Sequence, residues 1–249
     1  MPFGVDEAGK GPALGSMFAA AVYCEDPADL PDGIADSKRL APERREELAA
    51  TIRDDERLHV GVAEITPTRI DDPETDMNSL AVAAHAEAIG GALEDLDLES
   101  DGAEADALEA HPTDALEATS DRITGLCDAC DTDEDRFARR VASACGSRPS
   151  LPDPLADALE IEARHGADDE SPIVGAASVV AKVERDAHVA AIADEYGPVG
   201  SGYPSDPNTR EFLASYVDEH GDLPPFARET WSTCEDLLAE AQQTGLEQF

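Results

Sequence analysis

The chain has 249 residues, 41% of them hydrophobic, and a formal net charge of −38 that comes from 56 acidic and 18 basic residues. This length suits one sizeable domain or a domain with an appendage, and the hydrophobic content excludes a chain that is disordered throughout. There is no apolar run of membrane-spanning length and no secretory signal, so we expect a cytoplasmic protein without membrane contact.

Acidic residues occur along the whole sequence, whereas lysine occurs only at Lys10, Lys38 and Lys182. This composition is similar to that of cytoplasmic proteins from extreme halophiles. Such a chain repels phosphates in dilute buffer, but in 1 M salt the Debye length is about 3 Å and the repulsion shrinks to contact distance. High salt also removes the counterion release that normally drives nucleic-acid binding. Acidity therefore excludes a nucleic-acid partner only in a dilute medium.

The first residues combine a strand pattern with charged groups. A strand over residues 3–6 places Asp6 on the face opposite Phe3 and Val5. Asp6 and Glu7 are followed by a turn made of Gly9, Lys10 and Gly11. Small residues in such a turn let backbone N–H groups approach a phosphate or sugar. The pattern indicates a nuclease or phosphoryl-transfer enzyme, although an acidic pair before a glycine turn also ends many ordinary strands.

Hydrophobic periodicity predicts the next elements. In chain order they are a strand over 16–24 hairpinned to the first, a helix over 42–54, a strand over 58–65 and a helix over 77–96. The helix over 77–96 contains His85, and a single histidine in a helix is usually a surface or packed residue. Residues 97–121 have almost no bulky apolar groups, which predicts a solvated acidic insertion or loop.

The second half continues the alternation. We expect a strand over 123–130, a helix from 131 to about 144, a strand over 158–163 and a long helix over 172–195 whose first half is buried. A turn over 200–207 follows, in which Ser205 or Asp206 caps a helix to about 220. A last helix over 226–241 is expected to contain Trp231. Strands alternating with helices, then helices alone, predict an α/β domain over 1–196 and a C-terminal helical region over 197–249.

Cys127 and Cys130 form a C-x-x-C pair, which invites a zinc assignment. No second cysteine or histidine pair at zinc spacing accompanies them. On a strand, a separation of three residues points the two thiols to opposite faces. We therefore interpret both as small buried residues of a protein from a reducing compartment.

Three separate aspartates, Asp6, Asp128 and Asp168, each lie in or just after a predicted strand. Strand ends at one edge of an α/β sheet meet in space although they are distant in sequence. With Glu7 these residues make a cluster of four carboxylates, which needs protons or divalent cations to remain together. Oxygen ligands favour Mg²⁺ or Mn²⁺.

Seven stretches carry a resemblance to a known family: residues 4–12 (GVDEAGKGP), 36–40 (DSKRL), 77–78 (MN), 127–131 (CDACD), 167–168 (AD), 176–186 (AASVVAKVERD) and 200–207 (GSGYPSDP). In these stretches, and in their order, the chain resembles archaeal ribonuclease HII, the type 2 ribonucleases H. Residues 97–121 and 146–157 lie outside the resemblance. It implies the ribonuclease H-like fold, a mixed sheet flanked by helices, followed by a C-terminal helical appendage.

The resemblance also implies an activity and a site. The activity is that of an endoribonuclease that hydrolyses the RNA strand of RNA–DNA hybrids and incises 5′ to ribonucleotides in duplex DNA, leaving a 3′-hydroxyl and a 5′-phosphate. Two divalent ions, Mg²⁺ or Mn²⁺, are held by Asp6, Glu7, Asp128 and Asp168. Substrate is bound by Gly9, Lys10, Gly11 and Tyr203, with Lys38 and Lys182 in matched motifs. Tyr203 is expected to stack on the sugar at the RNA–DNA junction.

Several points stay open at this level. Lys10 stands where many relatives have arginine, Asp169 is a rival to Asp168, and Asp131 is a weaker rival to Asp128. A monomer is expected, and a sliding clamp as partner is weakly supported by residues 243–249. A non-catalytic nucleic-acid-binding member and a DNA-processing nuclease of the same fold are the alternative functions.

Overall fold

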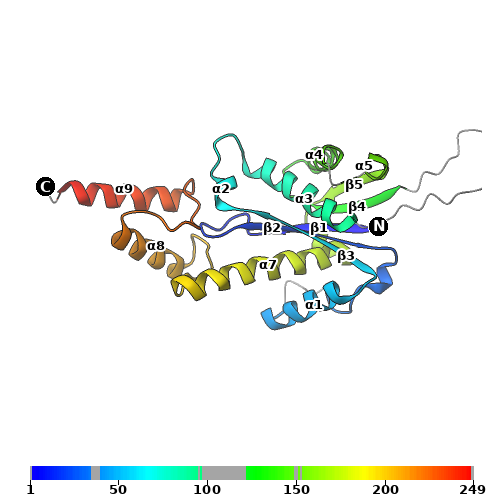
Figure 1. Ribbon diagram of the computed structural model, residues 1–249, viewed down its shortest axis with the longest axis horizontal. Coiled ribbons are helices and arrows are strands. Elements are labelled where there is room, and N and C mark those ends of the chain that lie inside the picture. Colours follow the sequence, from blue (N-terminus) through cyan, green and yellow to red (C-terminus); the bar gives the residue numbers. More distant parts are fainter. Residues whose placement is uncertain are drawn as a thin grey trace, which may run out of the picture.

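A mixed five-stranded sheet forms the centre of the computed structural model, which describes residues 2–34, 40–94, 96, 122–148, 151 and 153–247 (Figure 1). The strands are β1 (Phe3–Ala8), β2 (Met17–Cys24), β3 (Leu58–Ile65), β4 (Ile123–Asp128) and β5 (Leu159–Arg164). Their order is β3-β2-β1-β4-β5. The β1–β2 and β2–β3 pairs are antiparallel, and the β1–β4 and β4–β5 pairs are parallel. The prediction of a mixed α/β sheet is confirmed.

The central strand β1 has two different faces, as its sequence predicts. Phe3 and Val5 belong to the apolar cluster beneath α3 (Met77–Leu93) and α4 (Glu134–Gly146). Gly4 faces α7 (Pro172–Tyr196), and a Cβ atom at Gly4 would lie 2.5 Å from the backbone nitrogen of Val174. Glycine is therefore required where α7 crosses the strand, and alternation places Asp6 on the same face as Gly4.

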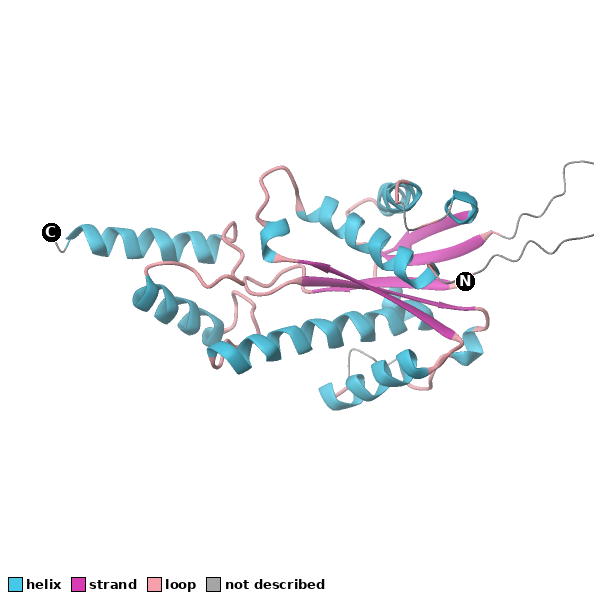
Figure 2. Ribbon diagram, in the orientation of Figure 1, coloured by secondary structure: helices cyan, strands magenta, loops and turns pink. Residues whose placement is uncertain are grey.

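Helices cover both faces of the sheet (Figure 2). One face carries α3, α4 and the short α5 (Asp153–Ala158), and the other carries α1 (Pro42–Asp54) and α7. The remaining short elements are η1 (Pro27–Asp29), α2 (Pro67–Ile70) and α6 (Ala167–Glu170). None of the helices in the described residues is long and apolar enough to cross a bilayer.

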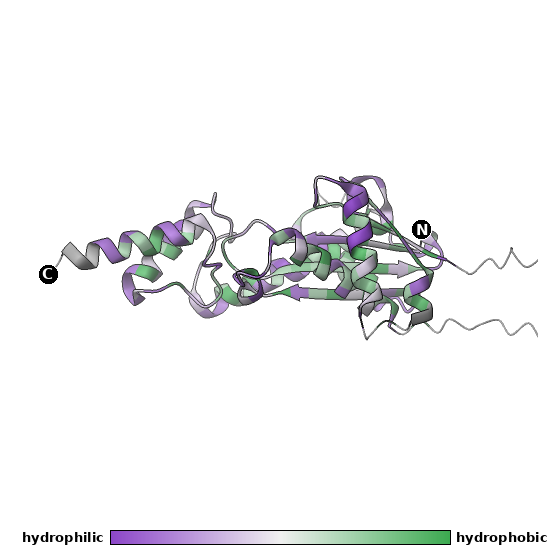
Figure 3. Cartoon of the chain, turned by 90° about the horizontal axis from the view of Figure 1, so that it is seen from above, coloured by the Kyte–Doolittle hydropathy of each residue, from purple (hydrophilic) through white to green (hydrophobic). Residues whose placement is uncertain are grey.

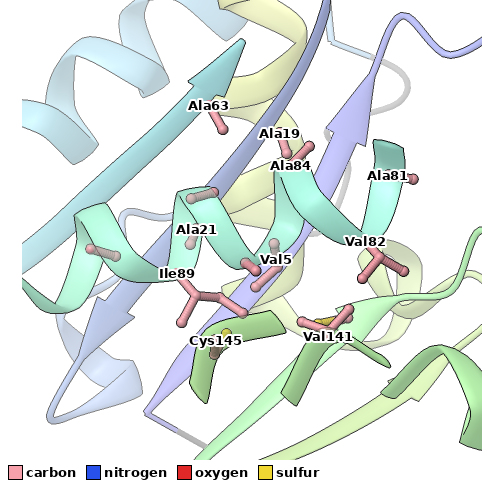
Figure 4. Packing of buried hydrophobic residues seen from close by; sticks show 14 of the residues in the cluster. Val5, Ala19, Ala21, Ala63, Ala81, Val82, Ala84, Ile89, Val141 and Cys145 are labelled. Carbon is pink, nitrogen blue, oxygen red and sulfur yellow. The ribbon is translucent and has the colours of Figure 1, made fainter. Parts of the chain in front are cut away.

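Small side chains let α3 lie close to the sheet. In Figure 4, residues of α3 lie over the strands with α4 beside them; the labelled members are Val5, Ala19, Ala21, Ala63, Ala81, Val82, Ala84, Ile89, Val141 and Cys145. A Cβ atom at Gly61 would lie 2.0 Å from the carbonyl oxygen of Ala88. The helix begins where the side chain of Asp76 accepts hydrogen bonds from the N–H groups of Asn78 and Ser79.

The C-terminal helices α8 (Pro207–His220) and α9 (Ser232–Glu247) lie beyond the end of α7 (Figure 1). Figure 3 shows hydrophobic and hydrophilic residues along each of them, as expected for helices with one packed face. Their cluster joins Leu213, Phe226 and Cys234 to Leu14 and to Ile192 of α7. This cluster contains residues from both sides of the predicted boundary between residues 196 and 197. The division into domains 1–196 and 197–249 stays a prediction.

Several predicted boundaries are wrong: the helix expected over 77–96 ends at Leu93, the last helix ends at Glu247 rather than 241, and two further differences change the setting of nearby residues. The last helix begins at Ser232 rather than near Phe226, because Ala227 forms a β-bridge with Leu14 and the N–H of Arg228 donates to the carbonyl of Ala13 at 2.8 Å. Trp231 therefore lies before the helix. The strand expected over 123–130 ends at Asp128. Lys38 and residues 97–121 lie outside the described residues.

Candidate active site

The ends of β1, β4 and β5 bring the predicted aspartates together. Val5 pairs with Cys127 in the parallel β1–β4 register, so the next residues of the two strands, Asp6 and Asp128, lie side by side. Asp168 comes four residues after the end of β5, in α6. The N–H group of Ala167 donates to Asp128 Oδ1 at 2.8 Å, which ties the start of α6 to the end of β4.

Asp6 lies in the most strongly perturbed environment of the cluster. The side chain is buried, and burial together with the charge of Glu7 raises the pKa of Asp6 to about 8. A hydrogen bond from Ser178 and the charge of Lys182 act in the opposite direction. Without a cation the folded protein therefore favours the protonated form of Asp6 at neutral pH, and a bound cation would stabilise the carboxylate form.

Ser178 connects Asp6 to Asp168. Its hydroxyl is hydrogen-bonded to Asp6 and lies 3.4 Å from Asp168 Oδ2. Lys182, one turn further along α7, donates to Ser178 Oγ, and its Nζ lies 3.7 Å from Asp168 Oδ2. The matched stretch over 176–186 thus places one hydroxyl and one ammonium group against the carboxylates.

Asp128 and Glu7 complete the cluster. Burial and the charges of Asp168 and Glu7 raise the pKa of Asp128, while the hydrogen bond from Ala167 acts against that shift. Glu7 points to the other face of the sheet, where its Oε2 lies 2.9 Å from Nε2 of His85. The structure therefore brings Asp6, Asp128 and Asp168 together at one end of the central strands, and Glu7 lies at the same end with its side chain on the other face of the sheet.

The two rival aspartates have different surroundings. Asp131 pairs with Arg136, whose Nε lies 3.0 Å from Asp131 Oδ2, and this partner lowers the pKa of Asp131 to about 2. Asp169 is exposed, whereas Asp168 is buried. The geometry favours Asp128 and Asp168 as members of the cluster.

Arg228 holds the glycine turn after β1 through hydrogen bonds to backbone carbonyl groups. This arginine is fully buried and donates to three carbonyl oxygens, those of Gly9 at 2.6 Å, Lys10 at 3.0 Å and Gly15 at 2.9 Å. Trp231 Nε1 donates to the carbonyl of Gly11 at 3.2 Å. Sequence reasoning did not identify Arg228, because almost all basic residues of this chain are arginine and nothing local distinguishes this one.

Lys10 lies within the turn, and Tyr203 lies beside it. Lys10 Nζ donates to Asn78 Oδ1 at 3.1 Å and to the carbonyl of Cys130 at 2.8 Å. Tyr203 is 40% exposed, and its ring lies 3.5 Å from the position that a Cβ atom on Gly11 would occupy. The guanidinium of Arg185 lies over this ring, 5.1 Å from its centroid. The predicted substrate-binding residues 9–11 and Tyr203 are therefore neighbours.

The C-x-x-C pair differs from its prediction. Because β4 ends at Asp128, Cys127 and Cys130 do not alternate along one strand, and both contact the cluster beneath α3 and α4. Cys127 is buried as predicted, whereas Cys130 is partly exposed. The sulfur of Cys130 lies near Glu7 and His85. His85 is a packed residue whose polar partner is Glu7.

A mixed sheet in this strand order, with carboxylates at the ends of its central parallel strands, defines a nuclease of the ribonuclease H-like fold. The profile of the family described as Ribonuclease HII matches residues 3–145 and 138–234. The chain belongs to the ribonuclease HII family and is an endoribonuclease of the ribonuclease H class.

Individual relatives agree with this assignment. Ribonuclease HII of Haloarcula marismortui is 51% identical over 249 residues, which cover 100% of both chains. The crystal structure of ribonuclease H2 from Pyrococcus horikoshii OT3 has a TM-score of 0.75 at 31% identity and covers 97% of this chain and 98% of that one. A PCNA:RNase HII complex from Archaeoglobus fulgidus has a TM-score of 0.71 at 31% identity, with coverage of 95% and 96%. The expected archaeal, halophile-like family is confirmed.

Proposed function

We propose that this enzyme hydrolyses the RNA strand of RNA–DNA hybrids and also incises duplex DNA on the 5′ side of embedded ribonucleotides, leaving a 3′-hydroxyl and a 5′-phosphate. Ribonuclease H activity on hybrids belongs to the family. Incision at single ribonucleotides is the finer part of the proposal. The observation that carries it is the contact between the exposed ring of Tyr203 and the turn at Gly11, which follows Asp6 and Glu7 in the chain.

The residues present suit a divalent cation. Asp6, Glu7, Asp128 and Asp168 offer only oxygen ligands, the set that Mg²⁺ and Mn²⁺ prefer. Burial and the charge of Glu7 raise the pKa of Asp6, so added positive charge would favour its carboxylate form. We therefore assign the four carboxylates as ligands of two divalent ions. When bound, such ions activate water and stabilise charge on the phosphate and the leaving oxygen.

The chain's own groups orient the carboxylates and the substrate. Ser178 and Lys182 restrain Asp168, and the ammonium of Lys182 places positive charge where a phosphate would approach. Arg228 and Trp231 hold carbonyl groups of residues 9–11 and 15 toward the protein, which fixes the turn before substrate arrives.

Recognition of RNA needs a group that senses the 2′-hydroxyl. The turn over residues 9–11 contacts the Tyr203 ring, which packs on Arg185, and we assign the sugar to the surface where the turn and the ring meet. A deoxyribose has no 2′-hydroxyl, so it would lose a hydrogen bond to the turn while keeping the stacking contact with Tyr203. The role of Lys38 stays a prediction, because this residue lies outside the described chain.

Incision assays in molar KCl with Mg²⁺ or Mn²⁺ test the proposal. The substrates are a duplex with one ribonucleotide, an RNA–DNA hybrid and an all-DNA duplex, and the Asp6→Asn variant is the control. We expect the parent to cut the first two and the variant to cut neither. Cleavage of the hybrid alone refutes the finer proposal, cleavage of all-DNA duplex supports a DNA nuclease, and no cleavage supports the non-catalytic alternative.

A sliding-clamp partner stays a separate prediction. The Archaeoglobus fulgidus relative was solved with PCNA. In this chain the candidate peptide contains Gln243, Leu246 and Phe249 and lacks paired aromatic residues. Size-exclusion chromatography of the full chain with the clamp, compared with a chain that lacks residues 243–249, tests this partner and the expected monomeric state together.

A further inference from the structure

Three side chains with different ligand atoms converge beneath α3, on the side of the sheet opposite Ser178 and Lys182. Glu7 comes from β1, His85 from α3 and Cys130 from the loop after β4. Their carboxylate oxygen, ring nitrogen and sulfur all lie within 4.8 Å of one another. The carboxylate cluster described above accounts for Glu7 but gives no role to the imidazole or the thiol.

The surroundings of His85 are unusual for a packed residue. The ring is fully buried in an apolar cluster and meets the Phe137 ring edge-on, with 5.1 Å between centroids. Nε2 contacts Glu7 Oε2 at 2.9 Å, whereas Nδ1 has no partner among the described residues. An apolar side chain would fill this place without an unsatisfied polar atom. The imidazole therefore adds a ligand to the site at the expense of core packing.

Nitrogen, sulfur and oxygen ligands together select a borderline metal such as Zn²⁺ rather than Mg²⁺. Zinc bonds of 2.0–2.3 Å in tetrahedral geometry place ligand atoms roughly 3.3 to 3.8 Å apart, so small side-chain rotations suffice. We propose that Glu7, His85 and Cys130 form a Zn²⁺ site, with water as fourth ligand, whose occupation holds Glu7 on this face of the sheet, away from Asp6, Asp128 and Asp168, and inhibits the nuclease. The inhibition rests on the proposed function; the binding does not.

The same contacts limit the strength of the site. A metal on Nε2 obliges Nδ1 to carry the ring proton without a partner, and the ammonium of Lys10 lies nearby on the carbonyl of Cys130. Both features oppose a cation. Affinity below that of four-ligand structural zinc sites follows, so binding is reversible and responds to the concentration of free zinc.

Cobalt(II) tests the site without any activity measurement. The full chain is titrated with Co²⁺ in molar KCl without Mg²⁺. We expect a near-ultraviolet thiolate-to-cobalt charge-transfer band, which Cys130→Ser abolishes and Cys234→Ser preserves, because Cys234 is buried in the C-terminal cluster. Since loss of an outer partner of a metal ligand already weakens affinity 10–100-fold, loss of a ligand in Cys130→Ser or His85→Phe is expected to cost at least about tenfold for Zn²⁺.

Binding of Co²⁺ without the charge-transfer band, or a band that survives Cys130→Ser, overturns the site. Thermal unfolding of each metal-free variant confirms that it is folded, and Cys130→Ser provides the test if His85→Phe does not fold. In a second arm Zn²⁺ is added to the parent at fixed Mg²⁺. Inhibition that Cys130→Ser escapes supports the regulatory part, and equal inhibition of both overturns it. A parent that binds Co²⁺ through sulfur but cuts no substrate contradicts the proposed function alone.

Discussion

Replacing Asp6 by asparagine is expected to stabilise the metal-free protein while it removes the activity. The carboxylate is buried, and its pKa of about 8 compares with 3.8 for an ordinary aspartate. Each pKa unit corresponds to about 1.4 kcal/mol, so the charged form costs at most about 6 kcal/mol in the folded state. The pKa of Asp128 is raised as well, so part of this cost is shared between the two groups and we expect a gain of roughly 2 to 3 kcal/mol.

The pH dependence follows from the direction of the shift. The folded state binds the proton of Asp6 more tightly than the unfolded state, so this group's stabilising contribution is complete below pH 3.8 and is lost as the pH rises to about 8. Asparagine stays neutral throughout. The difference between variant and parent is therefore larger at pH 8 than at pH 5, and divalent cations reduce it because they stabilise only the parent's carboxylate.

Thermal unfolding in molar KCl with a chelator, at pH 5 and pH 8, measures this difference. For a domain of this size, 2 to 3 kcal/mol corresponds to roughly 4 to 12 °C in the midpoint temperature. Asp131→Asn is the matched control with the opposite sign, because the Arg136 partner holds the pKa of Asp131 at about 2 and its charge stabilises the fold above pH 3.8. A metal-free Asp6→Asn variant less stable than the parent at pH 8 refutes the reasoning.

Three further substitutions test the elements around the site. Arg228→Lys leaves backbone carbonyls without donors at about 1 to 3 kcal/mol each, so we expect a lower unfolding free energy in denaturant titration and a higher KM; an unchanged KM contradicts the turn's role. Tyr203→Ala is expected to reduce discrimination between ribonucleotide and all-DNA substrates, while the free energy of unfolding changes by less than about 1 kcal/mol because the ring is 40% exposed. Tyr203→Phe is the control that preserves stacking. A loss of stability in parallel with the loss of discrimination would exclude a specific role for Tyr203. Gly4→Ala is expected to cost more than about 2 kcal/mol in thermal unfolding, because its Cβ would lie 2.5 Å from the backbone of Val174; a neutral result means that α7 can move away.

The features predicted well from the sequence depend on local patterns. Alternation in β1 fixed which face carries Asp6, and the ends of three strands identified the aspartates that meet there. The start of α9 was predicted too early because the apolar pattern near Phe226 is helical, whereas a bridge to Leu14 keeps the backbone extended. That bridge joins residues about two hundred positions apart, and nothing local in the sequence indicates it.

The hydrogen bonds of Arg228 and His85 also could not be predicted from local sequence patterns. Arg228 is separated by 213 to 219 residues from the carbonyls that it binds, and His85 by 78 residues from Glu7. Each side chain is buried, so its hydrogen bonds are determined by which backbone or carboxylate group folding brings to it. Residue type alone could not separate these two from a surface arginine or an ordinary packed histidine.

Two of the three lysines explain how a chain this acidic keeps positive charge at its site. Lys10 and Lys182 each bind a small acceptor close to the carboxylates, respectively Asn78 Oδ1 and Ser178 Oγ. An ammonium group is a compact point charge with three donors, whereas a guanidinium needs room for a planar fork. Exposed ion pairs of the chain use arginine, as in Arg44–Glu47 and Arg164–Glu162. Lys10 and Lys182 therefore place compact ammonium groups in the turn after Asp6 and Glu7 and beside Asp168.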